Sequence, residues 1–176
     1  MKSLAQHLAQ YKSVHFNRYN LMTHFIGIPL IIWAVMMLLT GISFPYQIMG
    51  QTVNLATLVT FMVLAYYWLL APKLAFGLSI WFIASLISVS LVQTEQPLLL
   101  GGMVFIVGWL FQFVGHYFER AKPAFVDDLN QLLIGPLFLM AEVYFSLGLL
   151  TSLLYEITPA ALKLRHELEQ KRKQDS

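Results

Sequence analysis

Two short polar segments contain most of the side chains in this sequence that could do chemistry, and each borders a long apolar stretch. The first segment begins with His15 and ends with His24. Asn17, Asn20 and His24 share one face of a helix, because each residue turns the chain by about 100°. His15 lies on the opposite face of the same ideal helix. We therefore expect a helix start at Asn17, which is a good N-cap, with His15 reaching the site from the preceding turn.

The second polar segment closes a later apolar stretch and begins at Gln112. Gln112, His116 and Glu119 share a helical face by the same spacing rule. Gly108 and Gly115 lie seven residues apart, and such small residues let a neighbouring helix approach closely. The sequence therefore predicts a polar face at the end of this helix that meets another helix.

Together the two segments supply the ligands of a metal site. The imidazoles are those of His15, His24 and His116, and Glu119 adds a carboxylate. Two or three histidines with a carboxylate suit non-haem Fe(II), whereas three histidines and a water suit catalytic Zn(II). A ligating histidine usually donates its other N–H to a neighbour. The candidates for such supporting contacts are Asn17, Asn20, Gln112 and Asp128.

Structural roles for the same residues compete with this interpretation. A histidine near a helix end can serve only to cap carbonyl groups, and Glu119 could pair with Arg120 or Lys122 at the membrane interface. We expect Glu142, in the middle of an apolar stretch, to be protonated or hydrogen-bonded within the protein, because a bare charge there is costly. The two remaining histidines lie in polar surroundings and are expected to be solvated: His7 and His166.

The composition requires a membrane around these segments. The chain has 176 residues, of which 58% are hydrophobic and only 11% are charged, against about 25% charged residues in soluble domains. A soluble domain of this size needs a larger polar surface. The absence of cysteine excludes disulfides and thiolate metal sites. A net charge of +2 without a basic stripe argues against nucleic-acid binding.

The apolar stretches predict an all-α, polytopic helical bundle with four to five membrane-spanning segments. A span needs about 20 apolar residues, and the candidate stretches are 25–39, 53–70, 74–92, 98–118 and 129–154. We expect one membrane domain over residues 1–176. Its parts are a short interfacial helix in 1–16, the bundle in 17–155 and a polar, charged tail in 156–176.

The lysines and arginines orient this bundle. Their alternation along the loops places the N-terminus in the cytoplasm, so that His24 and His116 lie at the same, cytoplasmic side. The basic tail also favours that side, which a fifth full crossing would not allow. The stretch 129–154 either crosses the membrane or breaks at Gly135-Pro136 and re-enters. We expect a bacterial inner-membrane protein with a site that faces the cytoplasm.

At the two polar segments the chain resembles the membrane-bound 2-hydroxy fatty acid dioxygenases, a family that includes the fungal enzyme of phytosphingosine breakdown. The first matching block consists of His15, Asn17, Asn20, His24 and Ile28-Pro29-Leu30. The second block consists of Gly108-Trp109, Gln112 to His116, Phe118-Glu119, Pro123-Ala124, Asp128-Leu129, Gln131, Pro136 and Glu142.

This resemblance implies an Fe(2+)-dependent enzyme that uses O2 to convert a long-chain 2-hydroxy fatty acid into the acid one carbon shorter. It implies that His15, His24 and His116 hold the iron. Relatives often carry proline where this chain has Arg18, and this cation is our candidate for binding the carboxylate of the lipid substrate. The expected partners are therefore the lipid, O2 and the membrane, and the oligomeric state stays open.

Two other functions remain compatible with the residues. A Zn-dependent membrane hydrolase for a lipid amide or ester would need similar ligands, but it would turn over without oxygen. A non-catalytic scaffold or transport subunit would use the histidines only for packing and would bind no metal. Metal binding and oxygen dependence separate these alternatives.

Overall fold

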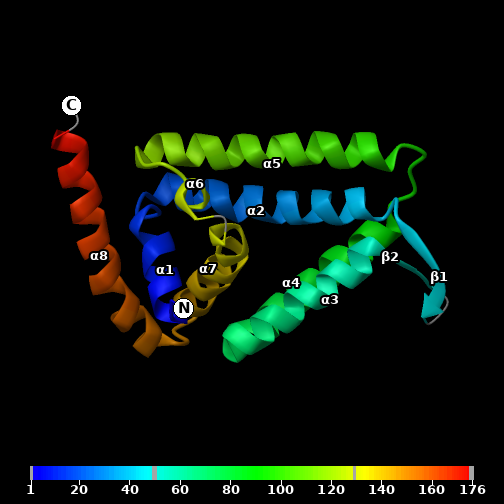
Figure 1. The fold of residues 1–176 in the computed structure, drawn as a ribbon, viewed down its shortest axis with the longest axis horizontal. Coiled ribbons are helices and arrows are strands. Elements are labelled where there is room, and N and C mark those ends of the chain that lie inside the picture. Colours follow the sequence, from blue (N-terminus) through cyan, green and yellow to red (C-terminus); the bar gives the residue numbers. More distant parts are fainter. Residues whose placement is uncertain (1, 49–50, 129, 175–176) are drawn as a thin grey trace. The chain divides into compact units, whose positions relative to one another are not determined.

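The computed structural model describes residues 2–48, 51–128 and 130–174, and these residues are predominantly helical (Figure 1). The predicted all-α class is confirmed. The helices are α1 (Leu4–Ser13), α2 (Arg18–Leu39), α3 (Leu55–Leu70), α4 (Pro72–Leu91), α5 (Pro97–Glu119), α6 (Ala124–Asp127), α7 (Gln131–Ser146) and α8 (Thr151–Gln174). One short antiparallel hairpin, β1 (Ser43–Ile48) and β2 (Gln51–Asn54), follows α2. The hairpin was not predicted and lies between the apolar helices α2 and α3.

Two compact units make up the chain. One combines Met1–Phe25 with Phe113–Ser176, and the other is Ile26–Gln112. Three helices are long and apolar enough to cross a bilayer, namely α2, α4 and α5, while α3 and α7 are shorter apolar helices. An integral membrane protein is therefore supported. The four to five spans, the single membrane domain and the interfacial position of α1 stay predictions.

Small residues bring α2 and α5 close together in the unit 26–112. A Cβ atom added to Gly108 would collide with Ile31, and one added to Gly27 would collide with the carbonyl of Gly108. This contact confirms that Gly108 lets a neighbouring helix approach. Trp33 of α2 also donates to the Ser88 hydroxyl of α4 at 3.0 Å. The unit is thus a set of apolar helices tied by close packing and by few polar contacts.

The unit formed by the two ends of the chain is built around α1. Its N-terminus carries a capping box, in which the Ser3 hydroxyl accepts from the Gln6 N–H and the Gln6 side chain accepts from the Ser3 N–H. Leu8 and Tyr11 are buried on its inner face. The helix packs against both α7 and α8. The charged C-terminal segment therefore lies beside the N-terminal helix.

The last apolar stretch, 129–154, is interrupted by a turn after Ser146 and not at Pro136. Helix α7 continues through Gly135 and Pro136, so the break considered there is not found. The chain turns between residues 147 and 150, where Gly148 and Leu150 adopt φ angles of 73° and 53°. Leu129, where this stretch was predicted to begin, lies outside the described residues.

Glu142 of α7 is paired with Lys12 of α1, with 2.7 Å between Nζ and Oε1. Both side chains are largely buried, so removal of one partner leaves an uncompensated charge. We expect Glu142→Leu or Lys12→Met alone to destabilise the protein by about 2 kcal/mol, and the double variant to approach wild type. Thermal unfolding in detergent measures this cycle. Additive losses in the double variant would show that the pair is not coupled.

Candidate metal centre

Three histidines from separate elements converge in the unit formed by the two ends of the chain. His15 lies between α1 and α2, His24 in α2 and His116 near the end of α5. The ring centroids of the three pairs are 4.4, 4.9 and 5.0 Å apart, and all three residues are buried. One nitrogen of each ring lies within 4.8 Å of the others. The prediction that these three imidazoles meet is confirmed.

The hydrogen bonds of His15 and His24 point their free nitrogens at each other. Nδ1 of His15 lies 2.6 Å from the Tyr11 carbonyl oxygen, and Nδ1 of His24 lies 2.9 Å from the Asn20 carbonyl oxygen. A carbonyl can only accept, so each Nδ1 carries the proton of a neutral ring. Both Nε2 atoms then present lone pairs, 3.0 Å apart. A shared cation relieves this repulsion, and the donor set therefore fits a metal ion.

The protonation state of His15 agrees with this role. Burial holds the pKa of His15 well below its ordinary value, and the neighbouring His24 and His116 lower it further. The ring is consequently neutral near pH 7. Neutral imidazole is the form that binds a metal ion.

The turn between α1 and α2 places His15 in the site. Its ring stacks on that of Tyr11, with centroids 4.1 Å apart and planes 5° from parallel. Asn17 begins the next helix, since its side-chain oxygen accepts from the Tyr19 N–H at 2.8 Å. Helix α2 starts at Arg18. The predicted helix start and the position of His15 in the preceding turn are thus confirmed.

Glu119 holds this turn against the end of α5. Its Oε2 accepts from the Asn17 N–H at 2.8 Å and from the Asn20 side-chain amide at 3.1 Å. Its Oε1 pairs with Nη1 of Arg165 at 2.7 Å. The Asn20 amide also donates to the Val14 carbonyl at 3.0 Å. The carboxylate therefore orients the segment that carries His15 and His24.

Arg165 of α8 was not predicted. The sequence offered Arg120 and Lys122 as partners of Glu119, but the structure pairs this carboxylate with Arg165. A second nitrogen of Arg165 donates to the Glu119 carbonyl at 3.2 Å. Nothing in the sequence separates Arg165 from the other cations of the tail, because the pairing depends on how α8 packs along α1.

The remaining predicted residues make other contacts or are exposed. Gln112 belongs to the unit 26–112, where its side-chain nitrogen faces Gly27. Asp128 accepts from the Asn130 N–H at 3.0 Å, and its other oxygen lies 3.6 Å from Nζ of Lys2. Arg18 is exposed at the start of α2. Among the predicted supporting residues, Asn17 and Asn20 contact the segment that carries His15 and His24. Both donate to the Glu119 carboxylate, and Asn17 also caps the start of α2.

Replacement of Arg165 tests how much the site depends on α8. Glu119 as a residue is only 3% exposed, and Arg165→Ala leaves its carboxylate without a cation. We expect a loss of about 3 kcal/mol in stability and a loss in metal affinity of about tenfold or more. Thermal unfolding and metal titration measure both.

The matched control for Arg165→Ala is the second ion pair of Arg165, which it makes with Glu169. Glu169→Ala removes an exposed contact with Arg165 on α8, and an exposed pair of this kind adds little to stability. Arg165→Lys keeps the charge and should recover part of the metal affinity. Equal effects of Arg165→Ala and Glu169→Ala would contradict the role of Arg165.

Fold and site together define a helical membrane protein with a buried three-histidine cluster that could hold a metal ion. Residues 1–147 match the model of the family described as "2-hydroxy-palmitic acid dioxygenase Mpo1-like". The chain is 31% identical over 176 residues to the 2-hydroxy-palmitic acid dioxygenase MPO1 of Saccharomyces cerevisiae, covering 97% of this chain and 92% of the relative. The chain belongs to the Mpo1-like family. No solved structure matches it.

Proposed function

We propose that the protein is an Fe(II)-dependent dioxygenase that acts on long-chain 2-hydroxy fatty acids. The balanced reaction is RCH(OH)COOH + O2 → RCOOH + CO2 + H2O. The C1–C2 bond breaks, C1 leaves as CO2, C2 becomes the carbon of the new carboxylate, and O2 is the oxidant that takes up the electrons of both carbons. The observation that carries this proposal is the convergence of three buried imidazoles, two of which direct their Nε2 atoms at each other at 3.0 Å, as ligands of a shared cation would. The name of the yeast relative supplies the substrate class.

The chain's own residues would hold the metal as follows. His15, His24 and His116 are the proposed ligands. The carbonyls of Tyr11 and Asn20 fix two of the rings by accepting their Nδ1–H groups. Glu119 positions the turn between them, with the help of Asn17 and Asn20. Bound Fe(II) would supply the activation of O2, and imidazole ligation with open positions is compatible with that metal.

The membrane would deliver the substrate to this site. A long-chain acid dissolves in the bilayer with its carboxylate and 2-hydroxyl at headgroup depth. His24 and His116 lie near those ends of α2 and α5 that carry the polar segments. We further infer that these ends face the cytoplasm of a bacterial inner membrane, following the distribution of lysine and arginine.

A turnover assay tests the function. Purified protein in detergent is loaded with Fe(II) and given 2-hydroxypalmitic acid with and without O2, and the acid one carbon shorter is followed by mass spectrometry. We expect product only with both iron and O2. Failure of iron-loaded protein to form this product would contradict the assigned reaction. Cleavage of a lipid ester or amide without O2 would favour the zinc hydrolase, since three histidines suit Zn(II) equally well.

A further inference from the structure

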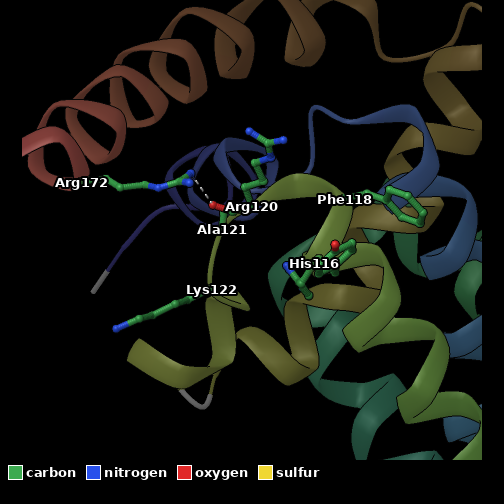
Figure 2. A pocket seen from close by; sticks show the side chains of 7 residues that line it. His116, Phe118, Arg120, Ala121, Lys122 and Arg172 are labelled. Atoms are coloured by element: carbon green, nitrogen blue, oxygen red, sulfur yellow. Dashed lines mark hydrogen bonds between the residues drawn. The ribbon is translucent and has the colours of Figure 1, made fainter. Parts of the chain in front are cut away.

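A pocket lies next to the candidate metal centre, at the end of α5. Its volume is about 660 Å³, within the usual range of small-molecule sites. The lining residues are His116, Tyr117, Phe118, Arg120, Ala121, Lys122 and Arg172. One of the three candidate metal ligands therefore forms part of its wall, as the close-up in Figure 2 shows.

The charge of this wall is positive. Three of the seven lining residues, Arg120, Lys122 and Arg172, carry cationic side chains, and none carries a carboxylate. The nearest acid along the chain, Glu119, is already engaged by Arg165 and by the N–H group of Asn17. The pocket wall thus carries positive charge without a carboxylate among its lining residues, and this favours an anion.

The backbone holds these cations around the end of the helix. Arg120 adopts a φ of 53°, a conformation that most residues avoid. Nη1 of Arg172, from α8, donates to the Arg120 carbonyl at 3.0 Å, and this bond is drawn in Figure 2. Arg172 is thereby tied to the loop that carries Lys122. The two cations come from segments far apart in the sequence and meet at one pocket.

We propose that this pocket binds the carboxylate of the fatty acid substrate, with Lys122 and Arg172 as the principal contacts. The proposal rests on the proposed function. A 2-hydroxy acid carries its reacting carbon next to the carboxylate, and His116 lines the same pocket as the two cations, so an anion held here keeps that carbon in the pocket that borders the candidate ligand. The structure assigns this role to Lys122 and Arg172 instead of Arg18, because Arg18 is not among the residues that line the pocket.

Binding measured without turnover tests the assignment. Purified metal-free protein in neutral detergent is titrated, without O2, with 2-hydroxypalmitic acid and with its uncharged methyl ester. We expect Lys122→Gln and Arg172→Gln each to weaken binding of the acid about fivefold, and the double variant at least tenfold. Binding of the ester should change less than twofold. Lys163→Gln is the matched control, because it removes an exposed cation of α8 that lies outside the pocket.

Four outcomes would overturn the proposal. In the first, the double variant binds the acid as wild type does. In the second, the double variant loses affinity for the acid and the ester alike, so the loss reflects a change in fold and not the loss of contacts to a carboxylate. In the third, Arg18→Gln weakens binding of the acid but not of the ester, which would assign the carboxylate to Arg18 instead. Competition by an anionic phospholipid, with no acid-selective loss in the variants, would assign the cations to the bilayer surface. An acid-selective loss in a protein that forms no product would support the pocket and contradict only the reaction.

Discussion

His24→Ala is expected to abolish metal binding and turnover. The variant removes one of two Nε2 atoms that lie 3.0 Å apart, and the loss of one of three protein ligands should weaken metal affinity by at least about 100-fold. Wild-type protein should gain thermal stability when Fe(II) or Co(II) is added, because a ligand that binds only the folded state stabilises it. The variant should show no such gain. Metal content and melting temperature are both measurable without substrate.

His166→Ala is the control for this experiment. His166 lies on the exposed face of α8 and bonds to Gln170 of the same helix, so its removal should leave the metal-dependent stabilisation intact. The structural alternative makes the opposite prediction for His24. If the histidines serve packing alone, wild type and His24→Ala will respond equally to added metal, and both will purify without it.

Gly115→Ala is expected to disrupt the centre without removing a ligand. A Cβ atom at this position would overlap with the Thr23 hydroxyl and the Asn20 side-chain oxygen and would press on Nδ1 of His24 at 3.2 Å. Because Thr23, Asn20 and His24 lie on one stretch of α2, the helix cannot move away without moving the histidine. We expect a loss of about 1–3 kcal/mol in stability and a large loss of metal affinity, measured by thermal unfolding and metal titration.

The same helix offers a matched control for the glycine. A Cβ atom at Gly102 would meet no atom within 4 Å. Gly102→Ala should therefore be neutral or stabilising by up to about 1 kcal/mol, because alanine restricts the unfolded chain and favours helix. If both variants behave alike, close approach of α2 and α5 at Gly115 does not determine the site.

Local sequence signals located most of the helices. The stretch predicted at 53–70 is α3 (Leu55–Leu70), and the stretch predicted at 98–118 is α5 (Pro97–Glu119). Apolar runs and the turn residues beside them determine a helix boundary through neighbours in the sequence. Such boundaries can therefore be predicted without knowledge of the tertiary structure. Helix α2 begins seven residues before its apolar run, and the capping side chain of Asn17 was the signal that indicated this start.

The convergence of the histidines could also be predicted from the sequence. It follows from the spacing of residues along a helix and from the opposite directions of the segments that carry His24 and His116. The contacts that depend on packing were not. Whether Glu119 pairs with a neighbour in sequence or with Arg165 is decided by the turn at residues 147–150, which brings α8 alongside α1. The turn lies within an apolar stretch, where composition gives little indication of a break. The same turn brings Arg172 to the pocket at the end of α5.

The match to the family covers residues 1–147, yet Arg165 lies beyond that boundary. A shortened chain that stops at residue 147 would keep all three histidines but would lose the guanidinium that faces Glu119. The region that matches the family model is therefore smaller than the region that positions the three histidines. Among relatives whose sequences diverge after this boundary, an arginine or lysine facing the equivalent glutamate is the feature to look for.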